Sequence, residues 1–408
     1  MINKIKLIMK LPEIGNKNIA VFYFLTIVNN SWFILGNWIF FWTRFMTFGR
    51  LGVVDALSFA FGLIMEVPTG AISDLVGKKK TILASCALGF IGVMLIASAN
   101  GIWPIFIGFL ITQAGWAFYS GSAEALAYDS LKEIRKDGQY DRVISASNVL
   151  GIIATVITTL LGAVMYKYNF RLPHYAWGFA YFFGFIASFW LKEPSVDTEK
   201  FSFKQYFRQM VEGAKQLLTP YLRPYVPIIF ALLGIYYLYS YGLVKPAIAI
   251  RFGFFATEQA IVQTVFGITC AIAVGLIPKM RRKLTDLAGL VVITSVLAVG
   301  FLLAAAPLGH YGFFVMLAIA LSGNLASPWV SIVVNRELPS KYRATALSTI
   351  ALFTKIPYVL TAMIAGRMID GGYLWLFNLI VGAIVAISVA WTLLYFSTKK
   401  NFWAYFRN

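Results

Sequence analysis

Four charged side chains lie within long apolar runs of this 408-residue sequence, namely Asp55, Glu66, Glu124 and Lys355. A charge near the centre of a bilayer costs at least ~2.5–3.5 kcal/mol, so such residues usually serve an ion or solute pathway or pair with one another. Glu66 and Glu124 could carry protons. Lys355, about 13 Å into its run at ~1.5 Å per residue, should face water, a solute or an acid. Asp55 is close enough to the end of its run to be wetted, and bracing of helices is the alternative for the other three.

The composition explains why these charges matter. Hydrophobic residues make up 59% of the chain and charged residues only 13%, whereas soluble domains have ~25% charged residues, so a soluble enzyme is excluded. A helix needs ~17–25 mainly apolar residues to cross a bilayer, and the chain supplies twelve such runs. The first run is too long for the core of a cleavable signal, so we expect it to remain as a span. The predicted spans are 19–43, 52–72, 82–99, 103–128, 143–166, 173–191, 226–244, 260–277, 287–306, 312–334, 346–368 and 374–395.

Positive charges are distributed unevenly between the two sides of the predicted membrane. With the N-terminus inside, 27 of the 35 Lys and Arg fall in inner segments and seven in outer loops. Because basic residues are retained on the cytoplasmic side, both termini are predicted to be cytoplasmic in a multi-pass protein of the cell membrane. The net charge of +18 is therefore mostly an orientation signal, and nucleic acid is not expected as a partner.

A long polar segment divides the predicted spans into two sets of six. Its charges are interleaved with aromatic residues, as in a helix that lies along the membrane surface. We predict a cytoplasmic N-terminal segment, a six-helix half, a cytoplasmic linker, a second six-helix half and a cytoplasmic tail. These parts are 1–18, 19–191, 192–225, 226–395 and 396–408.

Two inner loops indicate an internal repeat. The loops at 70–78 and 275–283 each begin with a glycine and have a charged residue at the fourth and the eighth following positions. Duplicated six-helix halves are typical of secondary transporters, whose solute site lies between the halves near mid-membrane.

The segment GAISDLVGKKK, residues 70–80, resembles the signature loop of the major facilitator superfamily, Gly-x-x-x-Asp-x-x-Gly-Arg-Lys/Arg-Lys/Arg. Both glycines, the aspartate and the last two lysines match, and Lys78 occupies the family's Arg position. The segments SGSAEALAYDSL at 120–131 and RATALS at 343–348 also resemble bacterial members. Together with the twelve spans, the resemblance covers essentially the whole chain. It implies an all-α polytopic membrane protein with the major facilitator fold, twelve transmembrane helices in two six-helix halves.

The resemblance also implies a function for this loop. Asp74, Lys78 and Asp129, which lies at the inner end of the fourth span, would form a charge relay that latches the outward-open state. Gly70 would allow close helix approach, and Gly77 would permit a tight turn at the membrane surface. An ordinary solvated loop is the alternative.

By the same resemblance, the first, fourth, seventh and tenth spans would line the solute cavity. Their amide and aromatic side chains suit a mostly neutral or amphiphilic organic solute, whereas Lys355 leaves room for an anion. The family's arrangement also places the second and eleventh spans against each other, so Glu66 and Lys355 could pair. Packing against lipid or other helices is the alternative for each aromatic residue. The candidates for lining the cavity are Asn30, Trp32, Asn37, Gln113, Trp116, Tyr119, Tyr237, Tyr241, Asn324 and Trp329.

Two departures from the family leave the substrate and the coupling open. Members that exchange drugs for protons often have an Arg in the fourth span and a Gly-Pro pair in the fifth, and this sequence has neither. The leading hypothesis is a secondary active transporter that exports a small organic solute by alternating access, with protons as a candidate coupling ion. A proton-coupled importer or a uniporter of a small anionic or polar solute is the alternative, followed by a receptor-like member that does not transport.

The sequence offers no catalytic constellation. Cys86 and Cys270 lie in apolar runs, His174 and His310 fall in separate outer loops, and neither an HExxH motif nor a GxxxxGK[ST] loop occurs. We therefore expect no enzyme, no metal and no cofactor. The expected partners are a small-molecule substrate, protons and membrane lipid, with the chain acting as a monomer.

Overall fold

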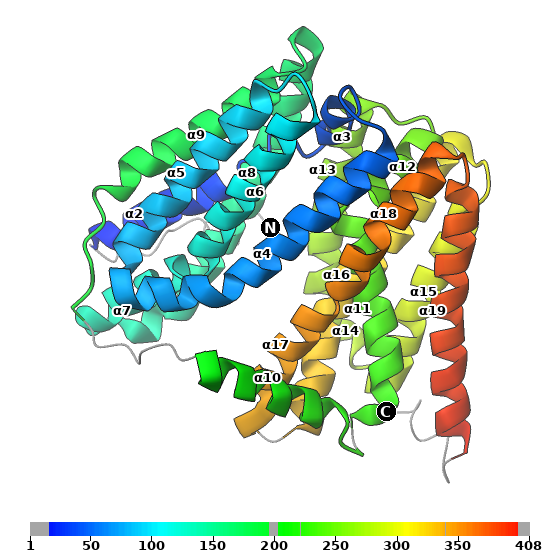
Figure 1. Ribbon diagram of the computed structural model, residues 1–408. Coiled ribbons are helices and arrows are strands. Elements are labelled where there is room, and N and C mark those ends of the chain that lie inside the picture. The colour runs from blue at the N-terminus through cyan, green and yellow to red at the C-terminus, as the bar shows by residue number, and fades with distance from the viewer. Residues whose placement is uncertain (1–15, 196–202, 221, 339, 399–408) are drawn as a thin grey trace. The chain divides into compact units, whose positions relative to one another are not determined.

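The chain is entirely helical in the part that the structure describes. The computed structural model covers residues 16–195, 203–220, 222–338 and 340–398, in which every regular element is an α-helix or a short 3-10 turn (Figure 1). This agrees with the predicted all-α class. The chain forms two compact units. Unit 1 comprises Met1–Met46 and Leu57–Phe203, and unit 2 comprises Thr47–Ala56 and Lys204–Asn408.

Helices follow one another with short connections in both units. The first eight are α2 (Lys17–Asn29), α3 (Trp38–Trp42), α4 (Phe48–Val76), α5 (Lys78–Ala97), α6 (Ile102–Ser120), α7 (Ala123–Glu133), α8 (Tyr140–Tyr168) and α9 (Leu172–Ser188). The next five are α10 (Phe203–Leu217), α11 (Val226–Tyr241), α12 (Val244–Arg251), α13 (Ala256–Gly275) and α14 (Ile277–Met280). The last five are α15 (Asp286–Ala304), α16 (Gly312–Glu337), α17 (Ser340–Phe353), α18 (Ile356–Asp370) and α19 (Leu374–Ser397).

Ten helical segments of the described chain are long and apolar enough to cross a membrane. They coincide with ten of the twelve predicted spans. The predicted span 173–191 corresponds to α9, which has 17 residues. The predicted span 19–43 corresponds to α2, an irregular stretch and α3. Each predicted span therefore has a helical counterpart, although the first is not a continuous helix.

The first span is interrupted where polar side chains bond to the local backbone. The Asn29 amide donates to the carbonyl of Leu25 at 3.0 Å, and the Asn30 amide donates to that of Thr26 at 2.9 Å. Such bonds compete with the helical ladder, and α2 ends at Asn29. The hydroxyl of Thr155 in α8 donates to the carbonyl of Asn30 at 3.0 Å, so a neighbouring helix satisfies part of the irregular backbone.

The eleventh predicted span is bent. The sequence predicts one helix over 346–368, but α17 ends at Phe353 and α18 begins at Ile356. Pro357 in the first turn of α18 has no N–H to donate to the carbonyl of Phe353, so the ladder is interrupted there. Lys355 therefore lies at a helix junction rather than in mid-helix.

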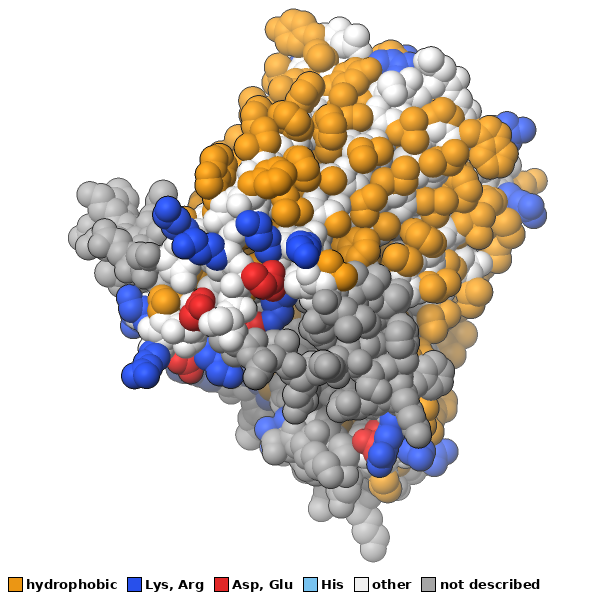
Figure 2. Space-filling view, turned by 60° about the vertical axis from the view of Figure 1, so that its left-hand side comes forward, with side chains coloured by type: hydrophobic (Ala, Val, Ile, Leu, Met, Phe, Trp, Pro, Cys, Tyr) orange, Lys and Arg blue, Asp and Glu red, His pale blue; other side chains and the backbone are white. Residues whose placement is uncertain are grey.

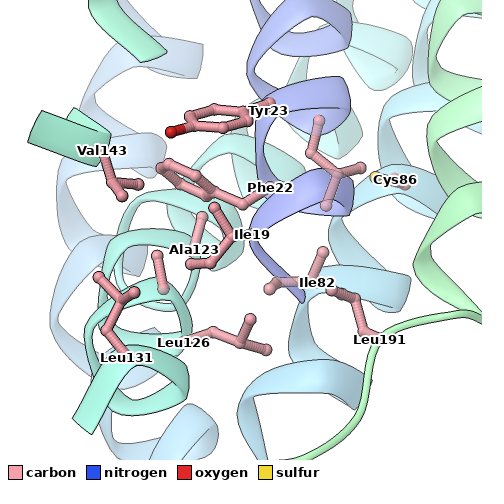
Figure 3. Packing of buried hydrophobic residues seen from close by; sticks show 12 residues of the cluster. Ile19, Phe22, Tyr23, Ile82, Cys86, Ala123, Leu126, Leu131, Val143 and Leu191 are labelled. Atoms are coloured by element: carbon pink, nitrogen blue, oxygen red, sulfur yellow. The ribbon is translucent and has the colours of Figure 1, made fainter. Parts of the chain in front are cut away.

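Unit 1 has a buried core at the meeting of α2, α5 and α7. Phe22 of α2, Ile82 of α5 and Leu126 of α7 are part of a cluster of buried hydrophobic residues (Figure 3). The backbones of α5 and α6 are in direct contact, because a Cβ atom on Gly92 would lie 2.5 Å from the carbonyl oxygen of Gly108. Small residues permit such close approach between membrane helices, where van der Waals packing provides much of the attraction.

Unit 2 is organised around α15, which packs against α16 and α19. A Cβ atom on Gly289 of α15 would lie 1.9 Å from the indole of Trp329, and one on Gly300 would lie 2.5 Å from Ile319. Two glycines on α15 therefore accommodate large side chains of α16. Because Trp329 and Ile319 are fully buried, the two helices are closely packed.

The start of α4 packs with unit 2. A Cβ atom on Gly52 would lie 2.4 Å from the carbonyl oxygen of Ala362, and one on Gly366 would lie 2.1 Å from that of Phe48, so α4 and α18 meet backbone to backbone. The predicted first half, 19–191, assigns all of α4 to one side, whereas this helix contributes residues to both units. The remaining domain boundaries stay a prediction.

The molecular surface is strongly divided by side-chain type. On the face shown in Figure 2, hydrophobic side chains form a broad area and many of the visible charged side chains gather beside it. Large apolar side chains on this and other surfaces are exposed, for example Ile64, Phe183 and Trp190. Exposed apolar area of this extent is expected of helices that face lipid.

Candidate functional site

A buried ion pair joins the predicted signature loop to the fourth span. Lys78 lies in the first turn of α5, and its ammonium group contacts the carboxylate of Asp129 in α7. Both side chains are only 8% exposed. The structure therefore brings together two of the three residues of the predicted charge relay. A buried charge pair of this kind is costly to break, because the remaining partner is left uncompensated.

The turn before Lys78 is closed by Glu193, which the sequence analysis placed in the linker without a role. Its two carboxylate oxygens accept the backbone N–H groups of Lys78 at 2.7 Å and of Lys79 at 2.8 Å. A carboxylate is stabilised at a helix N-terminus by the helix dipole. Gly77 has a φ of 102°, a conformation that favours glycine, which fits the tight turn predicted there.

Gly70 and Asp74 lie in the helical backbone of α4, but the packing of Gly70 and the side chain of Asp74 lie outside what the structure describes. Close by in sequence, the hydroxyl of Ser122 donates to that of Ser73 at 2.9 Å, which links the end of α4 to the start of α7. The role of Asp74 in a relay stays a prediction.

Unit 2 contains an ion-pair cluster of opposite polarity in the corresponding place. Asp286 opens α15, and its carboxylate accepts from Arg281 at 2.6 Å and from Arg336, near the end of α16, at 3.1 Å. The third span thus opens on a base paired with an acid, whereas the ninth opens on an acid paired with two bases. The two clusters share a place at the start of a helix, but in the register of the two loops Lys78 aligns with Lys283 and not with Asp286, so the internal repeat stays a prediction.

Trp329 belongs to this cluster and not to a solute-facing surface. Its indole N–H donates to the carbonyl of Asp286 at 3.2 Å, and the Arg281 guanidinium lies over its ring at 5.1 Å. The side chain is fully buried. Its assignment as a cavity-lining residue is therefore corrected, because the ring fills the space that Gly289 leaves on α15.

Asp55 is not wetted in the structure as the sequence suggested. It is 4% exposed, and its carboxylate accepts a hydrogen bond from the hydroxyl of Tyr358 in α18. Tyr358 is fully buried and packs on Gly242, where a Cβ atom would lie 2.3 Å from the phenol. No local pattern indicated this pair, since its members are 303 residues apart.

Two predicted cavity residues extend from Tyr358. The Tyr237 ring meets that of Tyr358 edge-on with centroids 6.0 Å apart, and it stacks on Tyr241 with centroids 4.3 Å apart. Tyr241 is 65% exposed. A column of three phenols therefore leads from the surface of unit 2 to the buried carboxylate of Asp55.

A second polar group of unit 2 contains Lys245, which follows the predicted span 226–244 and was expected in an outer loop. Lys245 of α12 donates to the side-chain oxygen of Gln263 in α13 at 3.0 Å. Burial lowers the pKa of the Lys245 ammonium to about 8, because the charged form loses hydration. The predicted candidate Asn324 donates to the hydroxyl of Tyr236 at 2.7 Å and is exposed. Amide, phenol and ammonium donors are the groups that bind small anions and polar solutes.

The predicted cavity residues of unit 1 fall into two environments. Asn37 is fully buried and donates to the carbonyl of Phe33 at 3.1 Å, so it stabilises the irregular backbone before α3. Gln113 is buried against Gly62, and Asn30 bonds to its own helix as described above. The structure thus gives all three amides packing roles within their unit.

The aromatic candidates of unit 1 form a cluster. Trp32 and Trp116 have ring centroids 5.3 Å apart, and both pack on the buried Trp177. The indole of Trp116 donates to the hydroxyl of Tyr181 at 2.7 Å. Trp32 and Trp116 are only partly buried, so part of this cluster remains accessible. The candidate Tyr119 is also partly buried but packs against the core of α2, α5 and α7 instead.

The other three predicted intramembrane charges differ in their exposure. Glu66 and Glu124 are exposed, and Lys355 is partly buried at the junction of α17 and α18. Glu66 belongs to unit 1 and Lys355 to unit 2, and their pairing stays a prediction. Within the described residues, no group of three or more His, Cys, Asp and Glu side chains is arranged to hold a metal ion.

The sequence matches the family model of the Major Facilitator Superfamily over residues 19–360. It is 22% identical over 241 residues to the multidrug resistance protein MdtH of Baumannia cicadellinicola subsp. Homalodisca coagulata, covering 59% of this chain and 54% of that protein. It is 29% identical over 156 residues to the nitrate/nitrite transporter NrtP of Picosynechococcus sp., covering 35% of this chain and 29% of that protein. These matches span about half or less of the length of the curated relatives.

Solved structures share the fold. The nucleoside transporter NupG superposes with a TM-score of 0.74 at 13% identity, covering 94% of this chain and 99% of that chain. The D-xylose-proton symporter gives a TM-score of 0.63 at 13% identity, covering 92% and 96%.

Proposed function

The chain belongs to the Major Facilitator Superfamily, and on this basis we propose that it is a secondary active transporter that moves a small solute across a membrane by alternating access. The observation that carries the proposal is the family match over 19–360 together with the buried Lys78–Asp129 pair at the family's signature loop. Family membership favours transport over catalysis. The uneven distribution of Lys and Arg supports a place in the cell membrane with both termini in the cytoplasm.

We propose export of a small organic solute as the direction and substrate class. The similarity to MdtH, which is named for multidrug resistance, supports export. The partly accessible aromatic cluster of Trp32 and Trp116 in unit 1 and the stacked Tyr237 and Tyr241 in unit 2 would favour an amphiphilic or aromatic solute. The latch is assigned to Gly70, Asp74, Gly77, Lys78 and Asp129, of which Lys78 and Asp129 are paired.

A second candidate function is uptake or facilitated passage of a small anion. Lys245, with Gln263, supplies a cationic donor group in unit 2, and one relative is named as a nitrate/nitrite transporter. Because the pKa of Lys245 is about 8, this group would be mostly charged at neutral pH and could attract an anion.

The test is transport by the purified protein in proteoliposomes, with and without an imposed pH gradient. The panel consists of fluorescent amphiphilic drugs and of nitrate and small carboxylates. Drug movement that Trp116→Ala slows supports the exporter, whereas nitrate movement that Lys245→Met abolishes supports the anion carrier. A folded protein that moves no member of the panel in either direction would contradict both and favour a receptor-like role.

A further inference from the structure

We propose that Asp55 and Tyr358 form a proton-binding site in unit 2, and that loading it with a proton loosens the attachment of the start of α4 to α18. The proposal deepens the proposed transport function, on which its physiological meaning rests, by naming the coupling ion and the residues that bind it. Glu66, Glu124 and Lys355 were the sequence-derived candidates for this role, and the structure gives Asp55 a much more enclosed environment.

The first argument is the burial of a carboxyl group without a cation. Asp55 is 4% exposed, and the ion pairs among the described side chains do not include it. An ionised carboxylate in such a place is costly unless it is paired or protonated. Tyr358 supplies one hydrogen bond, which lessens this cost but adds no opposite charge. The site is therefore built to exchange a proton rather than to hold a fixed charge.

The second argument is that Tyr358 suits both charge states. A phenol can donate to a carboxylate, and after protonation the carboxyl O–H can donate to the phenol oxygen. The proton comes from hydronium, a new O–H bond forms on the Asp55 carboxylate, and water is released. A hydrogen bond is kept throughout, although the charge-assisted bond to the carboxylate is the stronger one.

The third argument is the position of the pair within the contact between α4 and α18. The carboxylate of Asp370 accepts the backbone N–H groups of Phe48 at 2.9 Å and Gly49 at 2.7 Å, which ties the first turn of α4 to the end of α18. Further along α4, Gly52 contacts the backbone of Ala362, and the hydrogen bond between Asp55 and Tyr358 is the last of these contacts. From Leu57 onward, α4 belongs to unit 1. Weakening this bond would therefore loosen the contact at the point where the helix leaves unit 2.

Other titratable groups surround this contact but do not bond to the carboxyl group. Among the described residues, Tyr358 is the hydrogen-bond partner of Asp55. Asp370 is engaged at the N-terminus of α4, and Lys245 bonds to Gln263. Besides Asp55, the charged or titratable side chains on the unit 2 part of α4, on α11 and α12, and from Lys355 to the end of α18 are Arg50, Tyr236, Tyr237, Tyr239, Tyr241, Lys245, Arg251, Lys355, Tyr358, Arg367 and Asp370.

The first experiment detects the proton directly. Infrared difference spectra of the full chain in lipid nanodiscs, between acidic and alkaline buffer and without any solute, should show a C=O stretch of a buried protonated carboxyl group. Asp55→Asn should lose this band, and Tyr358→Phe should shift its frequency because the hydrogen bond is removed. Asp137→Asn, in an exposed turn, is the matched control and should keep the band. A band that persists in Asp55→Asn, or whose frequency does not change in Tyr358→Phe, would overturn the assignment of the proton-binding site.

The second experiment tests the coupling to structure. Spin labels at Arg50 and Tyr373, both exposed and both in unit 2, in a background without Cys86 and Cys270, report the spacing between the start of α4 and the turn that follows α18. Acid should broaden the distance distribution, and Asp55→Asn should show the broad distribution at every pH. An unchanged distribution would overturn the link to α4. Because neither measurement uses a solute, failure of the transport screen with a clear Asp55 band would remove the transport function and leave the proton site.

Discussion

The buried pair of Lys78 and Asp129 allows a quantitative prediction about stability. Both side chains are 8% exposed, so solvent screening is weak and removal of one partner should cost about 3–5 kcal/mol of unfolding free energy. An exposed pair would cost only ~0–1 kcal/mol. Lys78→Met and Asp129→Asn should therefore each destabilise the protein strongly, and the double variant should recover most of the loss.

The two single variants should differ in the unfolding free energy that they lose, and the charge of Glu193 determines which variant loses more. The N-terminus of α5 carries about +0.5 of a charge from the helix dipole, whereas the Glu193 carboxylate that accepts its N–H groups carries a full negative charge. The neighbouring Lys79 donates to the carbonyl of Phe189 and Lys80 is exposed, so the Glu193 carboxylate, bonded to the start of the helix, should favour a remaining Lys78 over a remaining Asp129. Lys78→Met should be the more destabilising variant, and in a Glu193→Gln background the order should invert.

Unfolding can be followed with a thiol-reactive dye in detergent, because Cys86 and Cys270 are both buried and free. The four variants of the cycle, repeated with and without Glu193→Gln, give the coupling energies. Single-variant losses below ~1 kcal/mol, or losses that simply add in the double variant, would refute the assignment of a buried pair. An order unaffected by Glu193→Gln would refute the electrostatic argument alone.

Four further predictions concern other charges. Because the pKa of Lys245 is about 8, below its ordinary value of 10.5, nitrate binding measured by calorimetry should weaken as pH rises through about 8, and Lys245→Met should remove this dependence. For the same reason, the unfolded chain binds this proton more tightly than the folded chain does. The contribution of Lys245 to the unfolding free energy should therefore rise as the pH increases from about 8 to 10.5. A fall over this range would contradict the lowered pKa. Asp74→Asn should lower transport without lowering expression and raise thiol labelling near the start of α17 from the cytoplasmic side, whereas wild-type labelling and transport would exclude the relay. Glu66→Gln and Lys355→Met should show a coupling of ~0.5–3 kcal/mol if the residues pair, and additive losses would exclude the pair.

Hydropathy was sufficient to locate the helices, because lipid leaves few alternatives to a long apolar helix. It could not show where those helices are interrupted. The end of α2 depends on amide side chains that bond to nearby carbonyls, and the junction of α17 and α18 depends on Pro357. Neither feature changes the average hydrophobicity of its segment, so each requires attention to backbone hydrogen bonds.

The site was only partly predictable for a related reason. The association of Lys78 with Asp129 was predicted from the resemblance of residues 70–80 to the family's signature loop. Such a resemblance depends on residues that are close together in the sequence. Asp55 was set aside because its depth was judged from its own helix, whereas its burial comes from Tyr358, far away in the sequence. Trp329 illustrates the opposite error, since an aromatic residue expected to face a solute fills the space above Gly289. Contacts between separate helices decided the cases of Asp55 and Trp329.

The opposite polarity of the two ion-pair clusters has a consequence for how the chain assembles. During insertion, helices of similar length and hydrophobicity from the two units compete for the same neighbours. If α15 took the place of α5 beside α7, Asp286 would meet Asp129, and if α5 joined α16, Lys78 would meet Arg336. The first exchange would put two carboxylates together that are each 8% exposed, where repulsion is strong, whereas the second would place Lys78 beside Arg336, which is 68% exposed and where repulsion is weaker. The inverted charges therefore favour the pairing of each helix with the partner from its own part of the chain.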